Sequence, residues 1–160
     1  MRQQSETKSP ASDLTMHWLV VGFMAALLLG YIVFCHTPQG AALQQPLAEH
    51  ERILLRTILY VAAIVTMPIT NLIRHIQLRL NQTMPGNKSA KSRYLLTVIV
   101  SMTLIESIGA YGLIMYLLGD GYNTLHIFII VSALGMYLYR PKVSEYESIV
   151  EALAEQSETV

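Results

Sequence analysis

Charge is scarce in this chain. Asp, Glu, Lys and Arg make up only 14% of its 160 residues, whereas about 25% of the residues in a soluble domain are charged. The formal net charge is zero, so no global electrostatic field attracts nucleic acid. These shortages exclude an ordinary soluble domain and indicate no nucleic-acid partner.

Cysteine and catalytic motifs are scarce as well. Cys35 is the single cysteine, so an internal disulfide is excluded. The sequence contains no P-loop, dinucleotide fingerprint, nucleophile elbow or H-E-x-x-H motif. The eight methionines show no M-x-x-M pattern that would suggest a copper relay. The sequence therefore predicts a protein that is not an enzyme and needs no cofactor.

Long apolar runs are what the chain has instead. Hydrophobic residues make up 52% of it, and a helix needs about 20 such residues to cross the hydrocarbon core. The sequence predicts an all-α fold, a polytopic membrane protein with a bundle of four transmembrane helices over residues 16–140. Residues 1–15 are expected to form a disordered cytoplasmic tail, and residues 141–160 an acidic amphipathic helix. The four predicted spans are 17–35, 53–73, 94–118 and 122–139.

Lys and Arg concentrate at one end of these spans. Only Arg52 and Arg56 fall at the other end. Because cytoplasmic segments carry the excess of Lys and Arg, both termini and the loop between the second and third spans are predicted to be cytoplasmic. A multi-pass protein of a bacterial inner membrane is expected. The basic residues on the predicted cytoplasmic side are Arg2, Lys8, Arg74, Arg79, Lys88, Lys91, Arg93, Arg140 and Lys142.

Glu106 is the one charged residue inside the run 94–118. A carboxylate at the centre of a bilayer costs roughly 2.5–3.5 kcal/mol on insertion scales. Glu106 should therefore be neutral, paired, or turned toward a protein interior or a water-filled path. Gly109 and Ala110 lie on the same helix face, and their small size lets another helix or water approach. Thr103, one turn earlier, is predicted to hydrogen-bond the acid.

The stretch from Glu106 to Gly119, ESIGAYGLIMYLLG, resembles the proteolipid c-subunits of rotary ATP synthases. In that family, an acidic residue in the second helix of a hairpin binds and releases the transported ion. The second and third spans would form such a hairpin, joined by a basic cytoplasmic loop. The resemblance implies that Glu106 is a proton carrier in an ion-translocating protein.

Two other roles for Glu106 remain open. It could be a protonated structural group bonded to Thr103, Thr66 or a tyrosine, or it could bond to the Arg or Lys of a partner subunit. The leading prediction is a small accessory or stabilising subunit of a larger membrane complex, in a hetero-oligomer rather than a homo-oligomer. The alternative is the ion-translocating protein with Glu106 as its proton carrier.

Possible metal ligands gather at the predicted outer face. Imidazole and thiolate groups suit copper or zinc, but no pair here has diagnostic spacing, so no bound metal is predicted. His126 lies one turn into its span, where a histidine often bonds a backbone carbonyl. Glu49 and Arg52, at i and i+3, are spaced to form an ion pair at the start of a helix, with the Arg56 side chain extending outward to the membrane surface. The candidate ligands are Cys35, His36, Glu49, His50, Asp120 and His126.

The C-terminal segment repeats apolar residues at i, i+3, i+4 and i+7. These are Tyr146, Ile149, Val150 and Leu153, and glutamates occupy much of the remaining surface. An acidic helix is poorly suited to an anionic lipid surface, which favours Lys and Arg. The pattern predicts that these four residues dock onto a partner protein, or that the helix folds against the chain's own basic loop.

Overall fold

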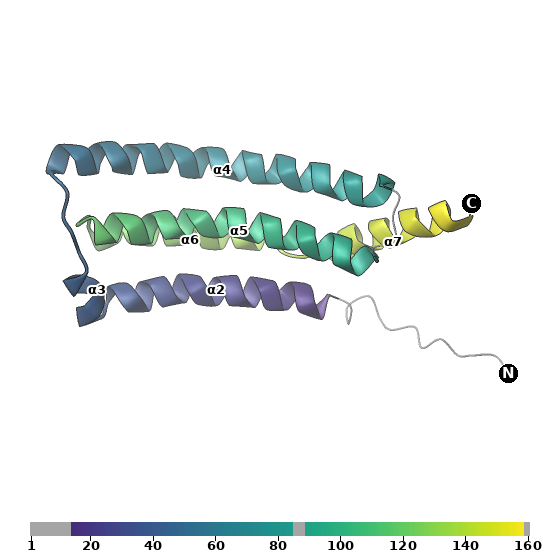
Figure 1. The fold of residues 1–160 in the computed structure, drawn as a ribbon, viewed down its shortest axis with the longest axis horizontal. Coiled ribbons are helices and arrows are strands. Elements are labelled where there is room, and N and C mark those ends of the chain that lie inside the picture. The colour runs from purple at the N-terminus through teal and green to yellow at the C-terminus, as the bar shows by residue number, and fades with distance from the viewer. Residues whose placement is uncertain (1–13, 85–88, 159–160) are drawn as a thin grey trace.

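The chain folds into helices that run side by side (Figure 1). The computed structural model describes residues 14–84 and 89–158, so most of the predicted tail 1–15 and part of the predicted cytoplasmic loop between the second and third spans lie outside the described residues. The described part contains six helices. They are α2 (Thr15–Cys35), α3 (Pro38–Ala42), α4 (Glu49–Thr83), α5 (Ala90–Leu117), α6 (Tyr122–Leu138) and α7 (Val143–Glu158).

Local chemistry sets several of these boundaries. The Thr37 hydroxyl accepts a hydrogen bond from the backbone N–H of Gly40 at 3.1 Å, and Pro38 occupies the first helical position of α3; both features favour a helix start. Gly119, with φ of 85°, ends α5 in a left-handed conformation that favours glycine. The paired bonds Asp120 N–H to Met115 O at 2.9 Å and Gly119 N–H to Tyr116 O at 3.0 Å form a Schellman motif.

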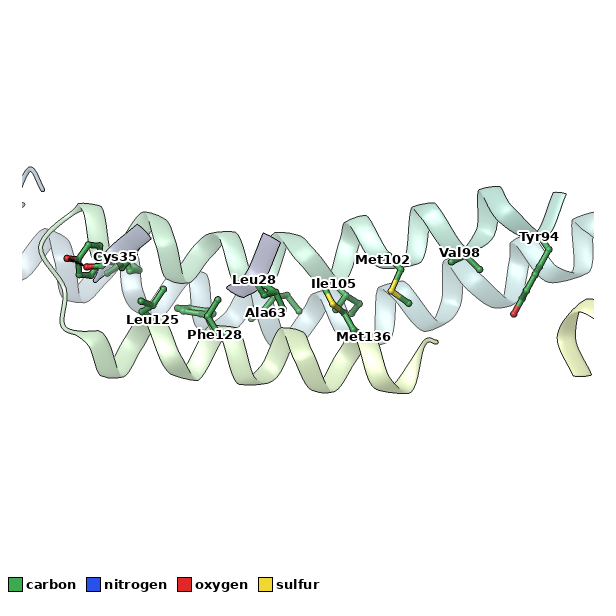
Figure 2. Packing of buried hydrophobic residues seen from close by; sticks show 14 of the residues in the cluster. Leu28, Cys35, Ala63, Tyr94, Val98, Met102, Ile105, Leu125, Phe128 and Met136 are labelled. Atoms are coloured by element: carbon green, nitrogen blue, oxygen red, sulfur yellow. Dashed lines mark hydrogen bonds between the residues drawn. The ribbon is translucent and has the colours of Figure 1, made fainter. Parts of the chain in front are cut away.

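Helix α5 is the centre of the bundle. Half of its most apolar 18-residue window is buried, against 11% of the corresponding windows in α2 and α4. Helices α2 and α4 lie on opposite sides of the α5–α6 pair (Figure 1). The buried core follows α5 from Cys35 at one end to Tyr94 at the other (Figure 2). The predicted all-α bundle is therefore confirmed for the described residues.

Three helices, α2, α4 and α5, are each long and apolar enough to cross a membrane. Helix α6 has only 17 residues, and with α7 it forms a pair bent by 43°. Large apolar side chains cover the outside of the bundle, including Leu19, Ile64 and Ile130 at 62%, 72% and 65% exposure. Such a surface belongs in contact with lipid. The chain is a multi-pass helical membrane protein with three to four spans.

Charged residues mark the two limits of the membrane layer. On α4, no charged residue lies between Arg56 and Arg74, about 27 Å apart at 1.5 Å per residue. Asp120 and Arg140 enclose α6 in the same way. The 17 residues of α6 rise about 26 Å at 1.5 Å per residue, slightly less than the roughly 30 Å of the hydrocarbon core, and together with α7 this helix is the fourth candidate span. The glutamates of α7 follow Arg140 in the chain.

Helix α4 is longer than the predicted span 53–73. It runs without interruption through Pro68 to Thr83, so its last turns extend past Arg74, beyond the membrane limit. There α4 and the beginning of α5 pack against α7. The beginning of α2, the end of α4 and the beginning of α5 lie at this end of the molecule, and α3 lies at the other (Figure 1).

Candidate functional site

Glu106 lies in the middle of the membrane layer. It precedes Leu117, the last residue of α5, by eleven residues, which is about 16 Å along a helix. That is roughly half the thickness of the hydrocarbon core. The side chain is 7% exposed. A carboxyl group at this depth has no water to solvate it, so its partners within the protein decide its state.

Both oxygens of the Glu106 carboxyl are buried, and no donor among the described residues meets strict hydrogen-bond geometry with them. The phenol of Tyr31 on α2 lies beside the carboxyl, close enough for a weak side-chain hydrogen bond. The predicted bond from Thr103 is wrong, because Thr103 is exposed on the outside of α5. Thr66 instead donates to the carbonyl of Ala62 at 2.7 Å.

The small residues after Glu106 serve helix packing. A side chain added at Gly109 would collide with Leu28 of α2, so Gly109 allows α2 to approach α5. At Gly112, an added Cβ would lie 3.0 Å from both the Leu125 carbonyl oxygen and the Phe128 Cβ of α6. Ala110 is half-buried. The predicted close approach of another helix beside Glu106 is thus made by α2, which covers the carboxyl.

The outer-face residues do not assemble into a metal centre. Among the described residues, no three His, Cys, Asp or Glu side chains are grouped so as to hold a metal ion. Cys35 is fully buried. The rings of His36 and His126 lie 6.1 Å apart, and each Nδ1 bonds the carbonyl four residues earlier, at 2.8 Å for His36 and 2.7 Å for His126. His50 and Glu49 are exposed at the start of α4.

Arg52 and Arg56 bond across the bundle instead of along α4. Arg52 donates to the carbonyl of Gly119 at 3.1 Å, and Arg56 forms an ion pair with Asp120 at 3.3 Å. Instead of the predicted pairing of Glu49 with Arg52, both arginines contact the turn between α5 and α6. These contacts hold the N-terminal end of α4 against that turn.

A polar network at the opposite limit of the membrane layer was not predicted. The Arg74 side chain is 5% exposed and its Nη2 lies 2.6 Å from Oε2 of Glu145 on α7. The Tyr94 hydroxyl also donates to Glu145, at 2.8 Å, and Arg74 donates to Ser101 at 3.3 Å. The ring of His17 lies 5.0 Å from that of Tyr94. The network joins α2, α4, α5 and α7.

One signal in the sequence could have placed Arg74 inside. The buried residues of α4 are Ala63, Thr70 and Arg74, at i, i+7 and i+11, which is a single helix face. Arg74 therefore lies on the same buried face of α4 as Ala63 and Thr70. Glu145 carries no such signal, because its partner lies on another helix, 71 residues away.

Most of the apolar face of α7 is occupied by the chain itself. Tyr146 is 7% exposed and Ile149 is fully buried, and Leu153 packs against the core as a half-buried residue. Val150 is 42% exposed. Tyr146, Ile149 and Leu153 therefore fold against the chain's own helices, as one of the two predictions states. Docking of this helix onto a partner protein stays a prediction.

Comparison with known proteins gives no match: no protein-family model, no curated protein and no solved structure is significantly similar to this chain. The fold and the membrane-spanning character therefore rest on the chain's own residues, and the function must be argued from Glu106 and its surroundings.

Proposed function

We propose that this chain is a non-enzymatic accessory subunit that stabilises a larger complex in a bacterial inner membrane. The observation that carries the proposal is the Glu106 carboxyl, at mid-membrane depth and 7% exposed. Among the described residues only the Tyr31 phenol lies beside it as a donor, outside strict hydrogen-bond geometry. An unbonded polar group in hydrocarbon costs several kcal/mol. A partner subunit that bonds this carboxyl would recover that energy on assembly.

The charge distribution supports a cytoplasmic position for both termini. Arg74, Arg79, Arg93, Arg140 and Lys142 lie at the end of the bundle where α7 packs, and Arg52 and Arg56 lie at the opposite end. Lys91, near the beginning of α5, lies at the same end as these five, and the remaining predicted cytoplasmic cations Arg2, Lys8 and Lys88 are outside the described residues. An excess of Lys and Arg marks the cytoplasmic side of an inner-membrane protein.

The first test measures the mass and composition of the particle that contains this chain. The protein is extracted from native membranes in mild detergent as wild type, as Glu106→Gln and as Glu51→Gln. We expect a heteromeric particle, larger than the 17.9 kDa chain, whose recovery falls at least tenfold in Glu106→Gln. Removing the charge of one partner in a buried, hydrogen-bonded charge pair at an interface costs about 2–5 kcal/mol, and every 1.4 kcal/mol is a tenfold change in affinity.

Glu51→Gln is the matched control, because Glu51 is exposed at the outer end of α4 and the substitution makes the same change in charge. Glu106→Gln keeps the shape of the side chain, so the isolated bundle should fold as before. Equal recovery of the complex from all three proteins would contradict the proposal. A particle that contains only this chain would also contradict it.

Ion translocation is the second candidate, and the same carboxyl favours it. Glu106 lies at mid-membrane with the Tyr31 phenol beside it, an arrangement in which a proton could be held. Under this proposal, a hydrophobic carbodiimide labels Glu106 in a pH-dependent way, because only the protonated acid reacts. Proteoliposomes should then conduct protons with the wild-type chain and not with Glu106→Gln. Absence of labelling over the accessible pH range would reject the carrier role.

A further inference from the structure

Two histidines from separate helices meet at the end of the bundle opposite α7, where α3 lies (Figure 1). His36 directly follows the last residue of α2, and His126 lies one turn into α6. Their ring centroids are 6.1 Å apart, and the ring planes are inclined by 71°. His36 is exposed and His126 is half-buried, so solvent reaches the pair.

The hydrogen bonds of the two rings determine which nitrogen carries the proton. Nδ1 of His36 lies 2.8 Å from the carbonyl oxygen of Ile32, and Nδ1 of His126 lies 2.7 Å from that of Tyr122. Because a carbonyl oxygen can only accept, Nδ1 is the donor in each ring, and Nε2 of the neutral ring keeps its lone pair. Metal-binding histidines are oriented in this way, with the other ring nitrogen donating to a backbone carbonyl or a carboxylate.

The backbone beside the two histidines is held by tyrosine hydroxyls. The carbonyl of Cys35 accepts hydrogen bonds from Tyr116 at 2.6 Å and from Tyr122 at 3.2 Å, which joins the end of α2 to α5 and α6. The ring of Tyr122 also lies 4.7 Å from that of His36. The two imidazoles are therefore presented by a helical framework, which places ligands more accurately than a loop does.

The spacing of the rings fits one metal ion bound by both. An imidazole nitrogen binds Zn²⁺ at about 2.0–2.1 Å, so two rings on one ion have centroids roughly 4.5–6.5 Å apart, depending on the angle at the ion. The observed 6.1 Å lies within that range. One ion can therefore bridge the two Nε2 atoms while both Nδ1 bonds stay in place.

The rest of the coordination is left to water. Within residues 14–84 and 89–158, no three His, Cys, Asp or Glu side chains gather around one position. The Cys35 thiol is fully buried, and Asp120 is paired with Arg56. Two imidazoles suit late first-row metals, with Cu²⁺ bound more tightly than Zn²⁺, whereas Mg²⁺ and Ca²⁺ require oxygen ligands.

We propose that His36 and His126 form an exchangeable binding site for one Cu²⁺ or Zn²⁺ ion, which is bound through their two Nε2 atoms. The ion links the end of α2 to the beginning of α6, and water completes its coordination. This site uses neither Glu106 nor a partner subunit, so it stands or fails independently of the proposed function.

The first measurement titrates the full chain, purified in detergent without a polyhistidine tag, with Cu²⁺, Zn²⁺ or Mg²⁺ in a calorimeter. We expect one Cu²⁺ per chain, bound at least tenfold more tightly than Zn²⁺, and no measurable binding of Mg²⁺. The electron paramagnetic resonance spectrum of the Cu²⁺ complex should show coupling to two imidazole nitrogens. Coupling to a single nitrogen, or no binding of Cu²⁺ and Zn²⁺ at submillimolar concentrations, would overturn the site.

Variants separate metal binding from simple packing of the rings. His36→Phe and His126→Phe each keep an aromatic ring and remove its nitrogens, so each should weaken Cu²⁺ binding at least tenfold. Added Cu²⁺ should raise the melting temperature of the wild type, because a ligand of the folded state stabilises it, and should not raise that of either variant. His50→Phe is the matched control, since His50 is exposed at the start of α4.

The variants also allow a clear negative result. Unchanged Cu²⁺ binding in His36→Phe and His126→Phe would leave the two rings a packing role and overturn the proposal. An equal loss of binding in His50→Phe would likewise overturn it, because the ion would then lie elsewhere.

Discussion

Arg74 connects more parts of the chain than its position near the end of a span suggests. Its guanidinium contacts Glu145, Tyr94 and Ser101 and the carbonyl of Arg140. Replacing Arg74 with Gln should lower the free energy of unfolding by about 3 kcal/mol, because removing one member of a buried ion pair leaves the other uncompensated. Thermal unfolding in detergent measures this. Arg79→Gln, at an exposed position, is the control and should have little effect.

A substitution at Gly112 tests the packing of α5 against α6. Its missing Cβ would lie 3.0 Å from the carbonyl oxygen of Leu125 and 3.3 Å from the Cα of Leu125. Since backbone atoms of α6 cannot turn aside, Gly112→Ala should destabilise the bundle by about 1–3 kcal/mol. Gly22→Ala is the matched control, because nothing lies within 4 Å of its added Cβ. If Gly112→Ala lowers the free energy of unfolding less than Gly22→Ala does, the packing of α5 on α6 is contradicted.

At the scale of the element, α7 is the helix whose environment the sequence left open. Its apolar face is directed toward α4 and α5, with Ile149 fully buried and the neighbouring Val150 42% exposed. In detergent, Val150→Cys should react with a water-soluble maleimide at least tenfold faster than Ile149→Cys. Native Cys35 is buried, which keeps the background low. Equal rates at the two positions would show that α7 does not stay docked.

The elements were largely predictable, and the contacts between them were not. Long apolar runs fix the spans, because the bilayer requires them, and the Gly119 turn is readable from its own residues. The pairing of Arg74 with Glu145, and of Arg56 with Asp120, depends on which helices become neighbours. Side chains on separate helices leave no periodic signal, so Glu106 could be recognised as unusual while its neighbour Tyr31 could not.

At the scale of the whole molecule, one end gathers α7, the end of α4 and the beginning of α5, and the other gathers α3 and the α5–α6 turn (Figure 1). If the first end is cytoplasmic, Leu43→Cys, at a position that is 58% exposed, should react with a membrane-impermeant maleimide on intact cells. Ser89→Cys should react only after lysis. The reverse pattern would invert the proposed orientation.

The central position of α5 has a consequence for synthesis. Helices α2 and α4 each pack on α5, and contacts between the two of them are marginal at most. When only the first 84 residues have entered the bilayer, α2 and α4 are therefore both present but make almost no contacts with each other. The bundle can form only after α5, the third segment, has left the translocon, because α2 and α4 both pack on it. In a nascent chain stopped before that point, the two helices should separate in the bilayer. Such a chain should be degraded by membrane proteases that recognise unassembled helices.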